Sequence, residues 1–251
     1  MITTVIALLI GIQGSQPDSN NQEGLSASQI MSKMFAHYAE AKSAAGTIRM
    51  TQTANGVSVH TNTELQYDRP SQIFLHQIRD GSQARQWYLT SDGKEFSYDP
   101  PATRNPLIFG HKRMVEYVTQ HNISMTLVDI LGAASRSLGD LNPMIESAIS
   151  SKDLLKKLTG QWATIVYGGR HTVNGQTVQA VSGQFRENPN SPVSGEFEAY
   201  VSPQGDFMRY VLRQRLEFPQ YSRDPIEVTT TWDSDLKVGV TTDKSLYRVI
   251  P

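Results

Sequence analysis

The chain has 251 residues, a formal net charge of −1 and no cysteine. A near-neutral chain without lysine or arginine runs is a poor partner for nucleic acid. The lack of cysteine excludes disulfides, thiol catalysis, cysteine-type zinc sites and anchoring through an acylated cysteine. The length suits one large all-β or α+β domain.

The first residues form an apolar run followed by a polar stretch. The run from Val5 to Ile12 is too short to span a bilayer but has the length of a secretory signal core. It lacks a preceding lysine or arginine and a clear cleavage site, so a disordered or core-packed N-terminus is the alternative. We expect residues 1–24 to be a signal segment and disordered N-terminus. The protein is then exported, to the periplasm, without a lipid anchor.

An amphipathic helix is expected to open the domain. Ser26 and Gln29 have the spacing of a capping box, in which each side chain bonds the other residue's backbone N–H. The apolar stripe behind them repeats at four-residue steps: Ile30, Met34, Tyr38 and Ala41. The helix is predicted to end before Gly46, and its stripe needs a sheet to pack on.

Five alternating segments follow, at residues 47–54, 57–67, 73–79, 86–90 and 95–98. Three of their joints read Asn55-Gly56, Asp80-Gly81 and Asp92-Gly93. These pairs favour tight hairpin turns because they tolerate positive φ. Asp92-Gly93-Lys94 is therefore predicted to be a turn. A phosphate-binding loop would need more glycines and a helix start after the lysine.

Strand alternation stops between about residues 100 and 160, where two helical patterns appear. The first has a capping box at Thr126–Asp129 and these apolar positions: Ile123, Leu127, Leu131 and Leu138. The second starts at Asn142-Pro143, an N-cap followed by proline at the first helical position. Its apolar positions are expected in two short helices: Met144, Ile149, Leu154, Leu155 and Leu158.

Strands resume at residues 162–167, 171–173, 176–185, 195–201, 207–218 and 225–232. One side of these strands is apolar and the other polar, which is typical of an antiparallel sheet with one wet face. The predicted fold class is α+β: a curved antiparallel β-sheet forming an incomplete (half) β-barrel, with an N-terminal helix and a helical lid insert at about residues 120–160. We expect a single domain over residues 25–251.

Two stretches resemble the LolA/LolB-like lipoprotein-localisation factors. They are ELQYDRP at residues 64–70 and TSDGKEFSYDP at residues 90–100. In that family a strand ends in Arg-Pro, and a later hairpin reads Ser-Asp-Gly-Lys before a strand that ends in Tyr-x-Pro. The C-terminal LYRVIP looks like the family's final strand. The match is close over roughly residues 26–101 and architectural beyond them, which suggests a less characterised exported branch.

The resemblance implies a helical lid over an apolar cavity that holds acyl chains. At the matching Arg-Pro position stands Arg69, which the resemblance makes the lid latch, reaching backbone carbonyls of the lid. The other reading of Arg69 is a solvated arginine at a strand end.

A cavity for acyl chains needs only dry side chains, since burial supplies roughly 0.8 kcal/mol per methylene. The candidate lining residues from the sheet are Leu65, Tyr67, Phe74, Trp87, Leu89 and Phe96, and those from the lid are Leu127, Ile130, Leu131, Met144 and Ile149. For each of them, an ordinary filled core is the alternative.

No catalytic, metal or cofactor site is expected. The six histidines show no H-x-x-x-H or H-E-x-x-H spacing, and there is no G-x-S-x-G motif. Two carboxylate pairs, Glu196/Glu198 and Asp233/Asp235, are better explained as solubilising groups on strands or turns than as acid–base partners.

The sequence therefore predicts a soluble, monomeric, non-catalytic carrier of a lipid or of lipoprotein acyl chains. Such a carrier would exchange cargo with a membrane-protein donor or receptor. The alternative is a periplasmic sensor or regulatory module, RseB-like, that binds a ligand and a membrane-protein partner. An exposed apolar patch outside the cavity would favour that alternative.

Overall fold

The computed structural model describes residues 25–80, 85–99, 114–117, 119–120, 123–138, 142–149, 161–186, 193–217 and 224–249. The segments expected to be the signal (1–24) and the end of the helical insert (150–160) lie outside these ranges. None of the helices within the described ranges combines the length and apolar character needed to cross a membrane.

Three α-helices are described: α1 (Ala27–Glu40), α3 (Leu127–Leu138) and α4 (Pro143–Ile149). Their starts follow the predicted caps. The Ser26 backbone N–H donates to Gln29 Oε1 at 2.7 Å, and the Thr126 N–H donates to Asp129 Oδ2 at 2.8 Å. At α4, the Met144 N–H donates to Asn142 Oδ1 at 3.0 Å. Each cap satisfies a backbone group at a helix start or in the residue before it.

The N-terminal half of the sheet is a meander of antiparallel strands. It contains β1 (Ser43–Ala54), β2 (Val57–Asp68), β3 (Gln72–Arg79), β4 (Arg85–Asp92), β5 (Glu95–Tyr98) and β6 (Met114–Tyr117). Both residues of the β1–β2 turn, Asn55 and Gly56, have positive φ (50° and 75°), as the hairpin prediction requires. At the β4–β5 turn, Asp92 Oδ1 accepts from the Lys94 and Glu95 N–H groups, so this stretch is a turn.

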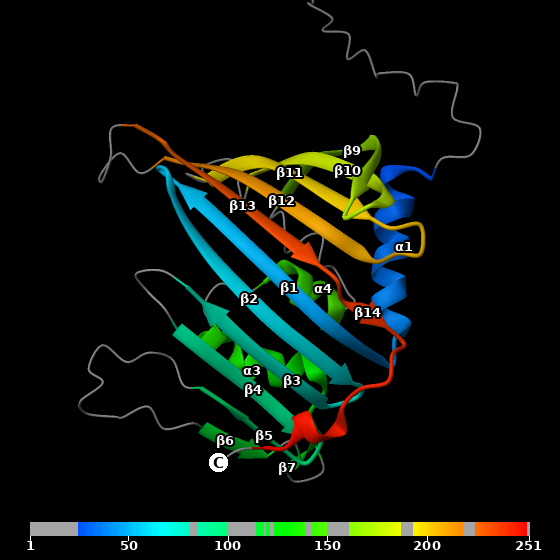
Figure 1. Ribbon diagram of the computed structural model, residues 1–251, viewed down its shortest axis with the longest axis vertical. Coiled ribbons are helices and arrows are strands. Elements are labelled where there is room, and N and C mark those ends of the chain that lie inside the picture. The colour runs from blue at the N-terminus through cyan, green and yellow to red at the C-terminus, as the bar shows by residue number, and fades with distance from the viewer. Residues whose placement is uncertain are drawn as a thin grey trace, which may run out of the picture.

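The C-terminal half is a second meander of β9 (Gln161–Val173), β10 (Gln176–Arg186), β11 (Val193–Val201), β12 (Phe207–Leu216) and β13 (Ile226–Ser234). Pairing of β1 with β13 joins the two halves, which gives the order β6-β5-β4-β3-β2-β1-β13-β12-β11-β10-β9. The sheet ends at β6 and β9, and no pairing in the described part closes it into a barrel. The α+β fold with a curved, open antiparallel sheet is thus confirmed (Figure 1).

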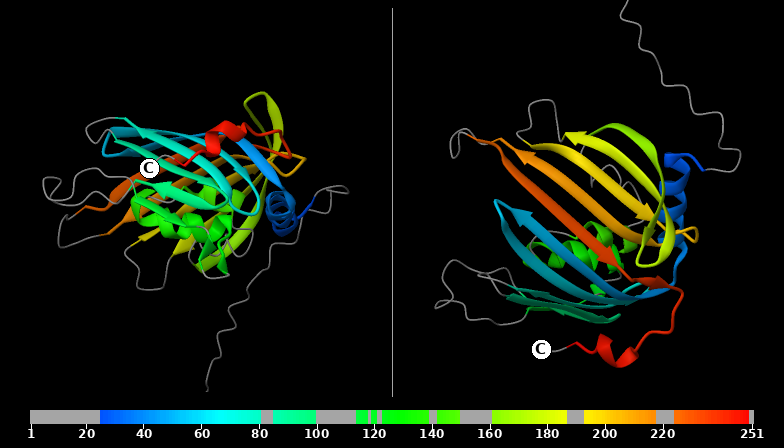
Figure 2. Two further views of the ribbon diagram at one scale, coloured as in Figure 1. Left: turned by 90° about the horizontal axis from the view of Figure 1, so that it is seen from below. Right: turned by 45° about the horizontal axis from the view of Figure 1, so that its top comes forward.

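The sheet curves around α3 and α4, which lie on its concave side (Figure 2). We call this the inner face. Helix α3 packs against β4 and β5, and α1 packs against β9, β10, β11 and α4. The two minor strands β7 (Thr119–Gln120) and β8 (Ile123–Ser124) pair with each other, and β14 (Lys237–Val238) pairs with β1.

Several boundaries differ from the sequence predictions. Helix α1 ends at Glu40, before Gly46 as predicted, but Ala41 of the expected stripe is its C-cap, and β1 begins at Ser43 and not at Thr47. Ile123 lies in β8 and not on α3, whose capping residue Thr126 comes after it. Strand β6 falls in the stretch where we expected none.

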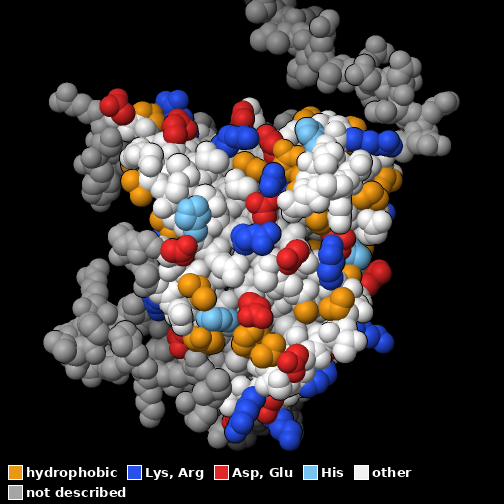
Figure 3. Space-filling view, in the orientation of Figure 1, with side chains coloured by type: hydrophobic (Ala, Val, Ile, Leu, Met, Phe, Trp, Pro, Cys, Tyr) orange, Lys and Arg blue, Asp and Glu red, His pale blue; other side chains and the backbone are white. Residues whose placement is uncertain are grey.

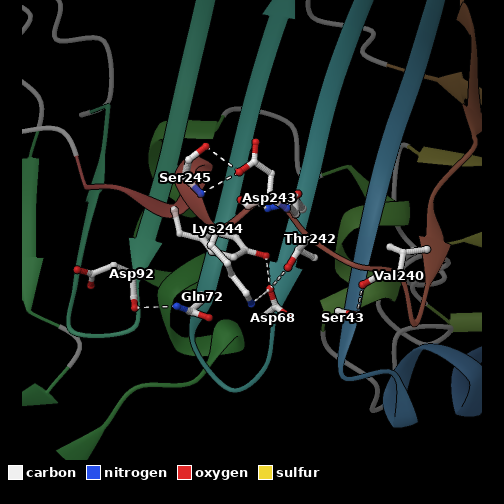
Figure 4. Close-up of polar contacts among 11 residues, drawn as sticks. Ser43, Asp68, Gln72, Asp92, Val240, Thr242, Asp243, Lys244 and Ser245 are labelled. Atoms are coloured by element: carbon white, nitrogen blue, oxygen red, sulfur yellow. Dashed lines mark hydrogen bonds and ion pairs between the residues drawn. The ribbon is translucent and has the colours of Figure 1, made fainter.

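A C-terminal strap, defined here as residues 240–247, crosses the outer face of the sheet (Figure 4). Ser43 Oγ donates to the Val240 carbonyl at 2.7 Å, and Gln66 Nε2 donates to the Asp243 carbonyl at 2.7 Å. The strap ends in the 3₁₀ helix η1 (Lys244–Tyr247), which packs on β3 and β4 and buries Tyr247. The expected final strand is therefore wrong from Leu246 to Tyr247, because side-chain bonds from β1 and β2 hold this segment and strand pairing does not.

Candidate functional site

The inner face is covered by one continuous buried cluster of apolar side chains. It joins strand residues such as Ile48, Leu65 and Leu75 to residues of all three helices. Side chains alternate between the two faces of a strand, so every second residue contributes to it. The cluster is where an acyl chain would find dry partners.

Ten of the eleven predicted lining residues are buried in this cluster. They are Leu65, Tyr67, Trp87, Leu89 and Phe96 from the sheet, with Leu127, Ile130, Leu131, Met144 and Ile149 from α3 and α4. The helical side chains thus pack directly over the sheet side chains. This arrangement fits both a closed lid and an ordinary core. A lid can move off the sheet while the domain stays folded, and a core cannot.

Phe74 is the residue that we placed on the wrong face. It is half-buried and lies outside the cluster, while its neighbours Ile73 and Leu75 are fully buried within it. In the register of β2 and β3, Leu75 lies opposite Leu65, and Phe74 lies opposite Gln66 on the outer face. Three consecutive apolar residues gave no alternation from which to choose the phase. Pairing the leucines of the two neighbouring strands, Leu65 with Leu75, would have placed Leu75 on the inner face and Phe74 on the outer face.

Arg69 makes the polar contacts that connect the sheet to two helices. Its Nη2 donates to the carbonyls of Ile149 at 3.0 Å and Ala148 at 3.3 Å, both at the end of α4. The same nitrogen donates to the Tyr38 carbonyl at 3.4 Å, and Nε donates to the Ala41 carbonyl at 3.1 Å, at the end of α1. These carbonyls belong to the final turns, where intrahelical donors are lacking. A cation there also complements the helix dipoles.

Tyr67 adds a second contact to the same place. Its hydroxyl donates to the Ala148 carbonyl at 3.0 Å, and the Arg69 guanidinium carbon lies 5.5 Å from its ring centroid. Burial raises the pKa of Tyr67, although the nearby Arg69 acts in the opposite direction. The hydroxyl therefore stays protonated and remains a donor. Sequence reasoning made Tyr67 a lining residue only, because a hydroxyl partner so distant in sequence leaves no local pattern.

Asp68, between these two residues, points to the outer face and holds the strap (Figure 4). Its Oδ2 accepts from Lys244 Nζ and the Tyr247 hydroxyl, both at 2.6 Å, and from the Thr242 hydroxyl. Burial alone would raise the pKa of Asp68, but these hydrogen bonds together keep that pKa below its ordinary value. The end of β2 therefore contacts α4 on one face and the strap on the other.

Of the two carboxylate pairs singled out in the sequence, Glu198, Asp233 and Asp235 have structural partners, and Glu196 is exposed. Glu198 accepts from Arg213 Nη1 at 2.8 Å and from the Tyr200 hydroxyl, and burial with this bond raises the pKa of Tyr200 to about 12. Asp233 accepts from Arg209 Nε at 2.6 Å, and Asp235 Oδ1 accepts from the Thr47 N–H at 2.5 Å. Within the described ranges, no three acidic or histidine side chains gather as metal ligands would.

No known family model matches the sequence, and no curated protein does either. Several solved structures are similar in fold. The Mycobacterium tuberculosis lipoprotein LppX matches at 8% identity and a TM-score of 0.43, over 85% of this chain and 96% of that one. The MucA/MucB complex of Pseudomonas aeruginosa matches at 9% identity and a TM-score of 0.43, over 89% of this chain and 60% of that one.

A LolA superfamily protein from Nitrosomonas europaea matches at 8% identity and a TM-score of 0.29, over 90% of this chain and 99% of that one. A lipoprotein-sorting protein domain from Vibrio parahaemolyticus is also among the matches. At such identities the similarity concerns the fold alone. The solved structures that match this chain thus include LolA superfamily proteins.

Proposed function

We propose that this protein is an exported carrier that binds the acyl chains of a lipid or lipoprotein on its inner face, with α3 and α4 as the lid. The observation that carries the proposal is the contact of Arg69 and Tyr67 with the end of α4. These are the lid carbonyl contacts that the sequence resemblance assigns to Arg69. The buried side chains of α3 and α4 then occupy the positions that acyl chains would take.

The energetic terms indicate a lid that is closed by default and opened by cargo. Hydrogen bonds from a charged donor contribute about 1.5–3 kcal/mol each to stability when well made. Burial of an acyl chain contributes roughly 0.8 kcal/mol per methylene, so a chain of about 14 methylenes contributes about 11 kcal/mol, which is more than the latch bonds to α4. Part of that gain is offset because the lid must expose its own apolar side chains. The latch therefore sets the resting state, and cargo of sufficient length overcomes it.

A regulatory module with a protein partner is the weaker proposal. Among the described residues, the large apolar side chains that are exposed are Leu25, Val57, Ile78, Val128 and Val166. They are spread over the chain: Leu25 precedes α1, and the others lie in β2, β3, α3 and β9. On the face shown in Figure 3, hydrophobic side chains form small groups among charges of both signs. A broad apolar docking patch, which such a module would favour, is not seen on that face.

Native mass spectrometry with added phospholipid and triacylated lipopeptide tests the carrier proposal. We expect wild-type protein to retain one of these molecules, and Leu131→Asp to lose it because the charge enters the cluster beneath α3. Val128→Asp is the matched control, since this residue is 46% exposed on the same helix. Wild-type protein that retains neither molecule would contradict the carrier function.

A further inference from the structure

Four consecutive residues, 67–70, at the end of β2 and in the turn after it, contact both helices of the lid. Tyr67 and Arg69 donate to carbonyls at the end of α4, each with a bond of 3.0 Å. The Pro70 carbonyl accepts from the Leu127 N–H at 2.8 Å, at the start of α3. The first and the last turn of the lid are therefore attached to the same short stretch of the sheet.

Asp68 connects this stretch to the C-terminal strap on the other face. Its Oδ2 accepts from Lys244 Nζ and the Tyr247 hydroxyl, both at 2.6 Å, and from the Thr242 hydroxyl (Figure 4). Thr242 and Tyr247 are the two buried residues of the strap, and both bond this one carboxylate. Asp68 is therefore the place where the buried side chains of the strap are held.

Asp68 also lies where β2 stops pairing with β1. It is opposite Ser43 in the last pair of that ladder, and one backbone bond follows, from the Arg69 N–H to the Lys42 carbonyl. The ends of strands open more easily than their middles. The strap bonds both members of the last pair, since Ser43 Oγ donates to the Val240 carbonyl at 2.7 Å. It therefore fastens the strand end from the outer face.

The latch depends on the position of this strand end. Tyr67 and Arg69 are the chain neighbours of Asp68, so a movement of its backbone moves both donors. A shift of about 1 Å would lengthen their bonds to α4 to about 4 Å, beyond hydrogen-bond distance. In the other direction, departure of α4 removes the contacts that hold Tyr67 and Arg69, and the strand end becomes freer to move.

We propose that residues 67–70 couple the lid to the strap, so that the attached strap favours the closed lid and an open lid loosens the strap. This inference rests on the proposed carrier function and describes how its lid is regulated. Coupling between two sites is reciprocal and typically changes an equilibrium constant by about 5–150-fold. Cargo that displaces α4 from the inner face therefore loosens the strap on the outer face. A loaded carrier then differs from an empty one on a surface that a partner can contact.

Amide exchange in the ligand-free protein tests the coupling. Asp68→Asn removes the carboxylate that holds the strap, and Tyr247→Ala releases the strap from its own side. Each should speed exchange in α4, residues 143–149, by at least about fivefold and leave exchange in α1 unchanged. Ser245→Ala is the matched control, because this strap residue bonds Asp243 and not Asp68. Wild-type exchange rates in α4 of either strap variant would overturn the proposal.

A double mutant separates coupling from a general loss of stability. Arg69→Lys weakens the latch from the inner face, so Asp68→Asn should speed exchange in α4 by a smaller factor in that background than alone. If the strap only adds to the stability of the whole domain, the two effects multiply and exchange in α1 rises as well. That result would also overturn the coupling.

Cargo tests the reverse direction and separates this inference from the carrier function. The probes are dioleoylphosphatidylglycerol and a triacylated lipopeptide. When either binds the wild type, exchange in residues 243–247 should rise, and Asp68→Asn should bind the probe at least about fivefold more tightly. A probe that binds with one or both effects missing would overturn the coupling and leave the carrier function. If neither probe binds while exchange in α4 rises in both strap variants, the carrier function is wrong and the coupling stands.

Discussion

Helices α1 and α4 pack against each other but are attached to the sheet in different ways. Contacts along α1 join it to the β11–β12 turn. The Tyr38 hydroxyl accepts from the Phe207 N–H at 3.1 Å, His37 Nε2 lies 3.2 Å from Asp206 Oδ1, and Lys33 donates to the Pro203 carbonyl. Arg69 also bonds the end of α1, and it is with Tyr67 that it donates to the C-terminal carbonyls of α4.

This difference bears on whether each helix can leave the sheet while the rest of the domain stays folded. A helix bonded at several points along its length leaves the sheet only when the domain unfolds. A seven-residue helix such as α4 has little stability of its own, and it depends on packing and on the contacts at its end. We therefore expect α1 to belong to the global unfolding unit and α4 to open locally.

The largest effect is expected from truncating one buried methionine side chain in each of the two helices. Met34 on α1 and Met144 on α4 are both buried in the same cluster. Met34→Ala should lower the free energy of unfolding by about 2–5 kcal/mol, measured by urea denaturation. Met144→Ala should lower it by less than half as much and should mainly speed amide exchange in α4. Equal losses of global stability would show that α4, like α1, leaves the sheet only when the whole domain unfolds.

A smaller effect is expected at Arg69, the proposed latch. Arg69→Lys keeps the charge but loses the planar fork that reaches several carbonyls at once. Opening of α4 should become easier by about 1–3 kcal/mol, seen as faster amide exchange in residues 143–149. The first turn of α1 is the internal reference. If exchange rises there as much as in α4, Arg69 supports the whole fold and is no latch.

The sequence predicted local features better than distant ones. Features that follow from neighbouring residues were predicted: the turns at Asn55-Gly56 and Asp92-Gly93, the helix starts at Ser26, Thr126 and Asn142, and most of the alternating strands. The predicted turn at Asp80-Gly81 runs into residues 81–84, which lie outside the described ranges. Pairing of β1 with β13 joins segments from opposite ends of the domain, and no local pattern encodes it. The same holds for Tyr67, whose partner is on α4. It also holds for the strap, whose last two residues were expected from the family resemblance to begin a final strand.

On the outer face of the sheet, Asp68 holds the strap, and its contribution to stability should depend on pH. Its lowered pKa means that the ionised form is favoured by folding, so its stabilisation is present above the ordinary pKa of 3.8. That stabilisation is lost as the pH falls through the lower pKa of the folded state. Asp68→Asn should cost about 1–2 kcal/mol of unfolding free energy at pH 7.

The cost of Asp68→Asn should shrink as the pH falls below 3.8 and through the lower pKa of the folded state, because the wild-type carboxylate then becomes protonated too. Urea denaturation at pH 7 and below pH 3.8 measures it. Glu227→Gln on β13 is the charge control, because it also removes one carboxylate but lies exposed and away from the strap. A cost that does not change with pH would mean that shape, and not charge, holds the strap.

The smallest effect is expected from the second contact to α4. Tyr67→Phe removes only the hydroxyl that donates to Ala148, so α4 should open more easily by about 0.5–1.5 kcal/mol. Amide exchange in α4 measures this, and the melting temperature should change little. Tyr88→Phe on the outer face of β4 serves as the control. An effect as large as that of Arg69→Lys would make Tyr67 an equal partner in the latch.

The seam between β1 and β13 has a consequence for how the chain is made. The first strand of the sheet pairs with its last long strand, so the middle of the sheet is completed only when synthesis has reached Ser234. Until then β1 carries a row of backbone donors and acceptors without partners, which other chains can pair with. A nascent chain of this topology gains from being kept from folding, or shielded, until its C-terminal strands have emerged.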